Sequence, residues 1–252
     1  MQTPNCLIKN HGTMMTDIDY SKIYDHNTMS KSDGAQNVKN KHIKFGDALA
    51  AIAYAHDIEY AQIVEHFPEV GNNERYHGAK YSIQDQMAFI KTNAKRTPKK
   101  ILEIGAGRGE VTLFLTAMGY DVTAVEPGVD FVQLITETSH TLYPHTAVGS
   151  YTYINKPLHL ADIDYSKFDT ILMVESLEHI LAEHFDPEWE KIKVNFKGYF
   201  IVVNWKKYHP IAVGQYARPE IHCRLVDDAL YDSYCEGHIT KVRDKSHLCI
   251  EI

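Results

Sequence analysis

Short apolar runs alternate with amphipathic segments from about residue 99 to the C-terminus. Runs that are typical of buried parallel strands occur at residues 101–104, 122–125, 170–174 and 199–203. Apolar residues at helical spacing occur at 110–118, 129–138, from 174 to about 183, and 227–234. A third strand is expected within 145–160, and a closing antiparallel hairpin over 238–243 and 247–252. This order predicts an α/β fold with a mostly parallel sheet.

The N-terminal part of the chain has a different pattern of apolar and polar residues. Residues 1–45 are rich in Asn, Asp, Ser and Lys without a sustained period, which predicts a flexible arm. Residues 46–66 and 82–94 have helical periodicity. We therefore expect an arm at 1–45, a helical segment at 46–94 that shapes the substrate side, and the main domain at 95–252.

Composition and net charge argue against several classes of protein. Of 252 residues, 44% are apolar and 23% charged, and the formal net charge is −7. This is ordinary globular composition, and its acidic balance argues against a dedicated nucleic-acid binder. The longest apolar run is far shorter than the ~20 residues of a membrane-spanning helix. With no visible secretory signal and no C-x-x-C pair, we expect free thiols and a cytoplasmic location.

A glycine-rich turn carries the most specific chemistry. Gly105, Gly107 and Gly109 alternate between the first strand and the next helix, so a ligand can approach bare backbone at a helix N-terminus. Glu103 precedes the first glycine and Glu126 ends the following strand. A carboxylate beside the turn suits a cationic ligand better than a pyrophosphate, and one at the next strand end can accept both ribose hydroxyls.

Residues 100–252 resemble a class I S-adenosylmethionine-dependent methyltransferase. The resemblance rests on E-x-G-x-G-x-G at 103–109, Val-Glu-Pro at 125–127 and Phe-Asp at 168–169 before the fourth strand. It implies a Rossmann-like, doubly wound, mostly parallel seven-stranded sheet with a terminal antiparallel hairpin and an N-terminal helical lid. It also implies S-adenosylmethionine as cofactor.

The resemblance also implies where the cofactor binds. Glu103 would hold its amino group, Gly105 and Gly107 would line its methionine part, and Glu126 would hold its ribose. The base would meet residues near Asp162, with His159 as a rival position. The full set of implied cofactor-binding residues is Glu103, Gly105, Ala106, Gly107, Glu126, Pro127, Asp162, Ile163 and Glu175.

A second group of candidate residues follows the fourth strand. If a helix starts near Ser176, then Glu175, Glu178 and His179 share one helix face. Two carboxylates and an imidazole are suitable ligands for Mg²⁺, Mn²⁺ or Fe²⁺, with His222 as a fourth ligand and His209 as the other candidate. This pattern resembles the metal-dependent small-RNA 2′-O-methyltransferases, although the same stretch occurs in relatives without a catalytic metal.

These observations predict methyl transfer from S-adenosylmethionine to an oxygen or nitrogen of a small molecule. The candidate catalytic residues are His179, His222 and Glu175, with an imidazole as the base. One alternative is metal-dependent ribose 2′-O-methylation of RNA. Another is a non-catalytic cofactor-binding subunit that scaffolds a partner. A nucleic-acid partner is not favoured, no membrane partner is expected, and the sequence leaves the acceptor and the oligomeric state open.

Overall fold

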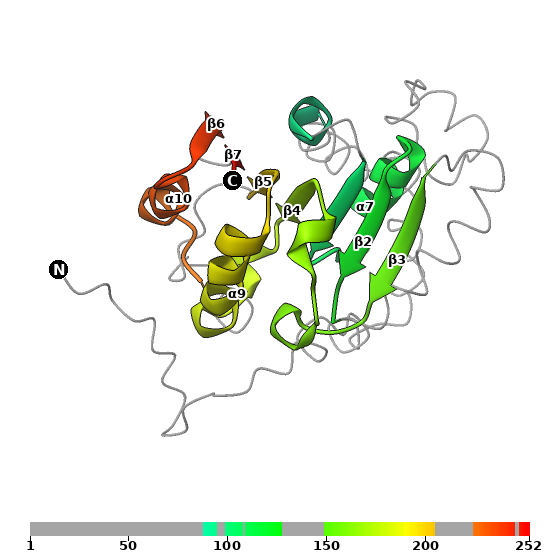
Figure 1. The fold of residues 1–252 in the computed structure, drawn as a ribbon, viewed down its shortest axis with the longest axis horizontal. Helices are drawn as coiled ribbons and strands as arrows, with labels where there is room; N and C mark the ends of the chain where they lie inside the picture. The colour runs from blue at the N-terminus through cyan, green and yellow to red at the C-terminus, as the bar shows by residue number, and fades with distance from the viewer. Residues whose placement is uncertain (1–87, 95–98, 108, 128–148, 205–223, 245–246) are drawn as a thin grey trace, which may run out of the picture.

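A computed structural model describes residues 88–94, 99–107, 109–127, 149–204, 224–244 and 247–252 (Figure 1). The predicted arm at 1–45, most of the helical segment at 46–94 and the predicted helix at 129–138 lie outside these ranges. Residues 88–93 are helical, as expected for the end of the 82–94 segment.

One seven-stranded sheet organises the described chain, in the order β3-β2-β1-β4-β5-β7-β6. Its strands are β1 (Lys100–Ile104), β2 (Asp121–Val125), β3 (Ser150–Ile154), β4 (Thr170–Val174), β5 (Tyr199–Val203), β6 (Ile239–Arg243) and β7 (His247–Glu251). The first five pair in parallel, whereas β7 runs antiparallel to β5 and to β6. The predicted sheet and its terminal hairpin are confirmed.

The register of the sheet brings the carboxyl ends of three strands together. Ile104 at the end of β1 pairs with Val125 of β2 and with Met173 of β4. The residues that follow these ends therefore leave the sheet along one edge. In an open α/β sheet, ligands bind in the crevice at this edge.

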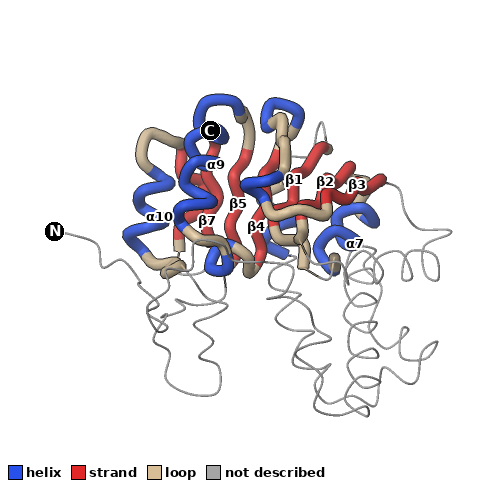
Figure 2. Tube along the Cα trace, turned by 90° about the horizontal axis from the view of Figure 1, so that it is seen from below, coloured by secondary structure: helices blue, strands red, loops and turns tan. Residues whose placement is uncertain are grey.

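Helices cover both faces of the sheet (Figure 2). Helix α7 (Glu110–Ala117) and residues 88–94 supply apolar side chains to one core cluster, and α9 (Ala182–Asn195) and α10 (Asp228–Cys235) supply the other. Alternate residues of the strands enter the two clusters, as Ile101 and Leu102 of β1 do. The arrangement is the doubly wound one that the sequence predicts.

The segment after β4 differs from the prediction. In place of a helix from near Ser176 to about residue 183, a single 3₁₀ turn, η3 (Leu177–His179), is followed by α9. Helix α9 continues through Pro187, which lacks an N–H for the helical ladder. Phe185, Trp189 and Ile192 are buried on one face of α9, and their burial explains why the helix persists. The shared α-helical face expected for Glu175, Glu178 and His179 does not form.

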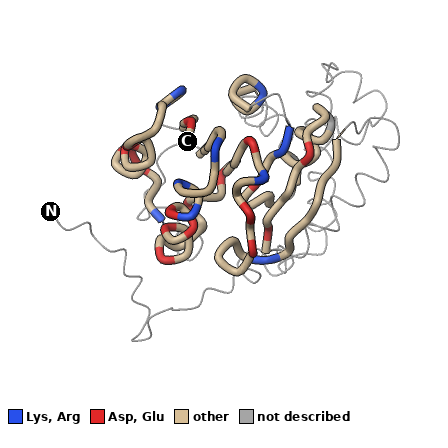
Figure 3. Tube along the Cα trace, viewed as in Figure 1, with Lys and Arg blue, Asp and Glu red and all other residues tan. Residues whose placement is uncertain are grey.

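Charged residues of both signs are spread over several of the described elements (Figure 3). Several form surface ion pairs, such as Arg243 of β6 with Asp228 and Asp232 of α10. None of the described helices is both long enough and apolar enough to span a membrane.

Candidate functional site

The glycine turn adopts the backbone conformation that its composition predicts. Gly105, Gly107 and Gly109 have φ angles of +73°, +54° and +83°, a region that residues with a Cβ rarely adopt. The Gly105 N–H donates to the Val125 carbonyl over 2.8 Å, which attaches the turn to β2. Gly109 then caps α7, so the turn lies between two strand ends and a helix N-terminus.

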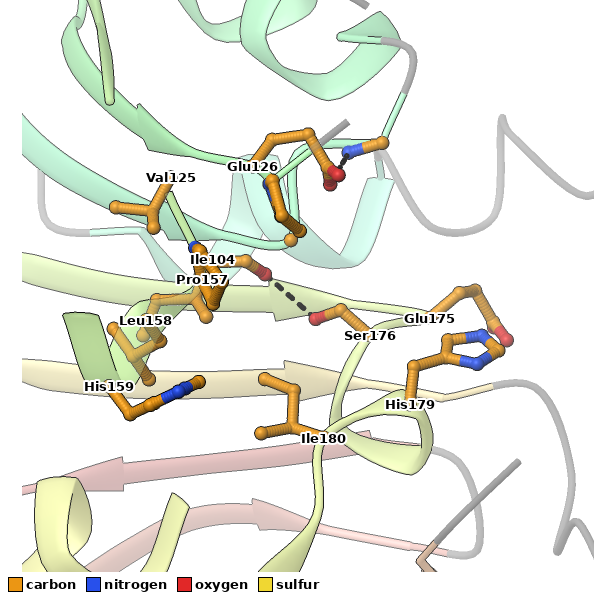
Figure 4. A pocket seen from close by; sticks show the side chains of 13 residues that line it. Ile104, Val125, Glu126, Pro157, Leu158, His159, Glu175, Ser176, His179 and Ile180 are labelled. Carbon is orange, nitrogen blue, oxygen red and sulfur yellow. Dashed lines mark hydrogen bonds between the residues drawn. The ribbon is translucent and has the colours of Figure 1, made fainter. Parts of the chain in front are cut away.

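Ser176 closes the turn on the side of β4. Its Oγ donates to the Ile104 carbonyl over 2.7 Å, between the end of β1 and the segment after β4 (Figure 4). A Cβ on Gly105 would lie 2.5 Å from the Ser176 Cβ, whereas one on Gly107 would meet nothing within 4 Å. Gly105 is thus required by close packing, and Gly107 faces open space.

Glu126 is a buried carboxylate at the end of β2, with 4% of its surface exposed. Its Oε2 accepts a hydrogen bond of 3.0 Å from the Gly107 N–H, and its backbone carbonyl accepts one from the Asn155 side chain. The carboxylate is therefore held between β2 and the glycine turn (Figure 4).

Glu103 lies in β1, two residues before the first glycine of the turn. It is buried, and its carboxylate accepts a hydrogen bond from the Thr112 hydroxyl of α7. It is not among the residues that line the neighbouring pocket, and neither is Ala106, which is buried within the turn.

An open pocket lies at this edge of the sheet (Figure 4). Its lining residues are Ile104, Gly105, Gly107, Val125, Glu126, Pro127, Pro157, Leu158, His159, Glu175, Ser176, His179 and Ile180. The pocket thus brings together the glycine turn, Glu126 and the segment after β4. Asp162 and Ile163 do not line it, whereas the rival position His159 does.

Glu175 has a strained backbone at the mouth of the pocket. Its φ of +49° is the single positive value among the described residues other than glycine. Its N–H donates to the Val203 carbonyl of β5 over 2.8 Å, which holds the chain as it leaves β4. Figure 4 shows the Glu175 carboxylate pointing toward the His179 ring. Strain of this kind is typical of functional sites.

Glu178 precedes His179 in the chain, and only 1% of its surface is exposed. Its Oε2 accepts a hydrogen bond of 2.8 Å from Asn204, and its Oε1 lies 3.6 Å from His179 Nε2. Burial raises the pKa of the Tyr231 hydroxyl, and the charges of Glu178 and Glu175 raise it further. The two carboxylates therefore act electrostatically on Tyr231 of α10.

The described residues do not form the metal centre that the sequence suggests. Within the described ranges, no three His, Cys, Asp or Glu side chains are grouped as metal ligands. The Glu178 carboxylate is buried and accepts a hydrogen bond from Asn204. In this arrangement Glu175, Glu178 and His179 do not form a set of ligands that is accessible to a metal ion. His209 and His222 are outside the described residues.

Sequence reasoning missed Ser176, Asn204 and the partner of His159. The His159 ring stacks on that of His184, with centroids 3.8 Å apart and planes at 15°. Ser176 could have been suspected from its position after β4, level with the turn after β1. Asn204 and His184 have no local signal, because their partners are distant in the chain.

Comparisons with known proteins agree with this geometry. A family model described as "Methyltransferase domain" matches residues 76–232, which is more than half of the chain. No curated protein sequence matches the chain.

Solved structures resemble the fold. TehB from Haemophilus influenzae is 15% identical, with 70% of this chain and 65% of that chain covered and a TM-score of 0.51. A putative O-methyltransferase from Nostoc punctiforme is 14% identical, with 66% and 55% covered and a TM-score of 0.48. Coclaurine N-methyltransferase, bound to N-methylheliamine and S-adenosylhomocysteine, is 18% identical, with 65% and 50% covered and a TM-score of 0.46.

This chain spans between half and two thirds of the length of these three proteins. At such identities the likeness concerns the fold alone. The family match covers the glycine turn, Glu126 and the segment after β4. The chain therefore belongs to the methyltransferase-domain family and has the class I S-adenosylmethionine-dependent methyltransferase fold.

Proposed function

We propose that this protein transfers a methyl group from S-adenosylmethionine to an oxygen or nitrogen atom of a small molecule. The observation that carries the proposal is one pocket in which the glycine turn and Glu126 face the Glu175–His179 pair. The first two features suit a nucleoside cofactor, and the pair is suited to proton transfer.

The pocket residues fit the chemistry of this cofactor. A buried carboxylate such as Glu126 can accept both hydroxyls of a ribose, and the bare backbone at Gly107 allows close approach. The acidic lining residues are Glu126 and Glu175, and no described Lys or Arg lines the pocket. This charge distribution favours a ligand that carries a positive sulfonium.

When bound, the cofactor supplies a methyl group whose bond to sulfur breaks with both electrons left on sulfur. The protein's task is then to position the acceptor and to remove its proton. We assign proton removal to the His179 imidazole, which lines the pocket, and orientation of that ring to Glu175. Roles for His222 in catalysis and for Glu103 and Ala106 in cofactor binding stay predictions.

A small acceptor agrees with the charge of the chain. The net charge is −7, and the described Lys and Arg residues are dispersed among several elements (Figure 3). An RNA substrate would instead favour a basic surface beside the site. The described residues thus offer no specific observation in favour of RNA methylation.

Calorimetric titration with S-adenosylhomocysteine tests the cofactor assignment. We expect micromolar binding to the wild-type protein and roughly tenfold weaker binding to Glu126→Ala, the range for a lost charge-assisted hydrogen bond. Glu190→Ala is a matched control, because Glu190 is exposed on α9 and does not line the pocket. Absence of binding to the wild-type protein would contradict the proposal.

Transfer itself needs a second assay. A screen of small amines and hydroxyl compounds with methyl-labelled S-adenosylmethionine should give labelled product that is lost in His179→Ala. Cofactor binding without transfer to any acceptor would favour the scaffold alternative. Transfer to RNA 3′ ends that requires Mn²⁺ would favour ribose methylation.

A further inference from the structure

Asn204 carries a buried hydrogen-bond acceptor that no described group satisfies. It directly follows β5, 4% of its surface is exposed, and its Oδ1 has no hydrogen-bond partner among the described residues. Buried polar atoms are nearly always bonded, so this atom calls for a partner from outside the described protein. We infer that the partner is a protonated amine, and that the methyl acceptor is therefore an amine nitrogen. The inference rests on the proposed function and narrows its acceptor from oxygen or nitrogen to nitrogen.

The orientation of the Asn204 amide is set by Glu178. The amide Nδ2 donates to Glu178 Oε2 over 2.8 Å. An ionised carboxylate only accepts hydrogen bonds, so the nitrogen of the amide and not its oxygen must face Glu178. The oxygen is then directed to another group, and it needs an N–H or O–H donor. An amine supplies such a donor, whereas a carboxylate or phosphate dianion does not.

Two carboxylates give the surroundings of Asn204 a negative character. Glu178 is bonded to the amide, and Glu175 is tied through its N–H to the carbonyl of Val203, the residue before Asn204. Burial raises the pKa of the Tyr231 hydroxyl, and the charges of Glu178 and Glu175 raise it further, so both charges act on one region. We call Asn204, Glu175 and Glu178 the Asn204 site. A cationic donor is favoured there, because charge-assisted hydrogen bonds are roughly twice as strong as neutral ones.

The arginines near the Asn204 site are paired with acids on other elements. The Arg224 backbone N–H donates to the Glu178 carbonyl, but its guanidinium pairs with Asp186 of α9 over 2.6 Å. Arg243, whose charge opposes those of the carboxylates at Tyr231, is paired with two aspartates of α10. No described Lys or Arg lines the pocket. The charge of the Asn204 site therefore favours a cationic ligand.

A divalent metal is the other cation that carboxylates and an amide oxygen can hold. Within the described ranges, however, no three His, Cys, Asp or Glu side chains are grouped as metal ligands. A primary ammonium group has three N–H donors and does not need a shell of about six oxygen ligands. The described residues therefore suit an ammonium group better than a metal ion.

Strand order places the Asn204 site at the opposite end of the sheet edge from the ribose partner. Glu126 follows β2 and the glycine turn follows β1, whereas Glu175 follows β4 and Asn204 follows β5. A nucleoside held at Glu126 thus leaves the β4–β5 end for the acceptor. Asn204 lies one strand beyond the pocket lining, so an acceptor that meets it extends from the pocket toward β5.

The transfer step balances for an amine. The bound ammonium group first gives one proton to the His179 imidazole, which leaves a lone pair on the nitrogen. This pair forms the new N–C bond while the S–C bond of the cofactor breaks with its electrons left on sulfur. The products are a methylated ammonium group and S-adenosylhomocysteine, and the imidazolium returns its proton to solvent.

Three probes of nearly the same shape test the inference. Benzylammonium, benzyl alcohol and benzoate are titrated into protein saturated with S-adenosylhomocysteine, and binding is followed by ligand-observed nuclear magnetic resonance. We expect benzylammonium to bind about tenfold more tightly than benzyl alcohol, the range for charge-assisted hydrogen bonds, and benzoate not to bind. With methyl-labelled S-adenosylmethionine, product should form on amines and not on their hydroxyl analogues.

Two variants connect this preference to the Asn204 site. Asn204→Ala removes the unsatisfied oxygen, and Glu178→Gln keeps the shape of the side chain but removes its charge. Each should lower the preference for benzylammonium over benzyl alcohol by about threefold or more, whereas a general loss of structure would weaken both probes alike. Asn195→Ala is the matched control, because Asn195 is exposed on α9. Titration with S-adenosylhomocysteine identifies the variants that are folded.

The outcomes separate the two proposals. If the wild-type protein does not bind S-adenosylhomocysteine, the proposed function fails and the inference fails with it. If it binds S-adenosylhomocysteine but binds none of the three probes, or binds benzyl alcohol or benzoate as tightly as benzylammonium, only the inference is overturned. A preference that both variants retain also overturns it. Saturable Mn²⁺ uptake that displaces benzylammonium and is lost in Asn204→Ala would assign the Asn204 site to a metal instead.

Discussion

Gly105 and Ser176 are packed so closely that a Cβ on Gly105 would lie 2.5 Å from the Ser176 Cβ. The Ser176 hydroxyl also donates to the carbonyl of Ile104, the residue before Gly105. These contacts pack the residue after β1 tightly against the segment that follows β4, so a side chain larger than glycine does not fit at position 105. The distance between the glycine turn and the Glu175–His179 pair therefore depends on one small residue on each side.

Gly105→Ala should be more damaging than Gly107→Ala. Both positions have positive φ, which costs a residue with a Cβ about 1–2 kcal/mol, but only Gly105 also meets a neighbour. We expect Gly105→Ala to lower the free energy of unfolding by more than Gly107→Ala and to weaken S-adenosylhomocysteine binding. Urea unfolding and calorimetry measure the two effects. The double variant Gly105→Ala/Ser176→Gly should recover part of both losses, and no recovery would show that the contact is unimportant.

Thr112 should stabilise the buried Glu103 carboxylate through its hydroxyl. Thr112→Val keeps the shape but removes the donor, and leaving a buried charged group with one partner fewer costs about 1–3 kcal/mol. Thr112→Ser keeps the donor and should lose much less. Equal stability of the two variants in urea unfolding would show that the hydroxyl does not matter.

Asn204 should be needed to keep Glu178 in place. Its side-chain N–H group donates to the buried Glu178 carboxylate over 2.8 Å, so Asn204→Ala should lower the free energy of unfolding by about 1–3 kcal/mol. Asn195→Ala is the control, because Asn195 is exposed and its bond lies within α9. Because Glu178 lies next to His179, the imidazole signals of His179 should also shift in nuclear magnetic resonance spectra of Asn204→Ala. Unchanged stability and spectra would contradict this role.

Removal of divalent metal should leave cofactor binding unchanged. The pocket residues that suit the cofactor are the glycine turn and Glu126, and Glu178 is bonded to Asn204 rather than open to an ion. Titrations with S-adenosylhomocysteine in EDTA and in Mn²⁺ should give the same affinity. Saturable Mn²⁺ uptake that disappears in Glu178→Ala would instead favour the metal-dependent alternative.

Cys249 should resist alkylation in the folded protein. It lies in β7 with 1% of its surface exposed, and burial raises the pKa of its thiol to about 11. At pH 8 the thiol is therefore protonated, and the thiolate is the reactive form. Peptide mapping after iodoacetamide treatment should find Cys249 modified in urea but not in buffer, whereas the half-buried Cys235 should react faster. Rapid labelling of native Cys249 would contradict this.

The local pattern of apolar residues was sufficient to predict most of the fold. Four apolar runs became β1, β2, β4 and β5, because a strand buried on both faces must be apolar throughout. The prediction was wrong after β4, where a 3₁₀ turn and then α9 replace the expected helix from near residue 176 to about 183, and burial of Trp189 helps to sustain α9 through Pro187.

Part of the candidate site could likewise be predicted from the sequence, and part could not. The alternating glycines and Glu126 are close in sequence to the strand ends that position them, so the sequence by itself determined that they lie together at one edge of the sheet. Only the tertiary structure placed His159 on His184, Ser176 against Gly105 and Glu178 beside Asn204. These contacts join residues on different elements, and they depend on strand order, strand register and helix packing, which no local pattern of residues encodes.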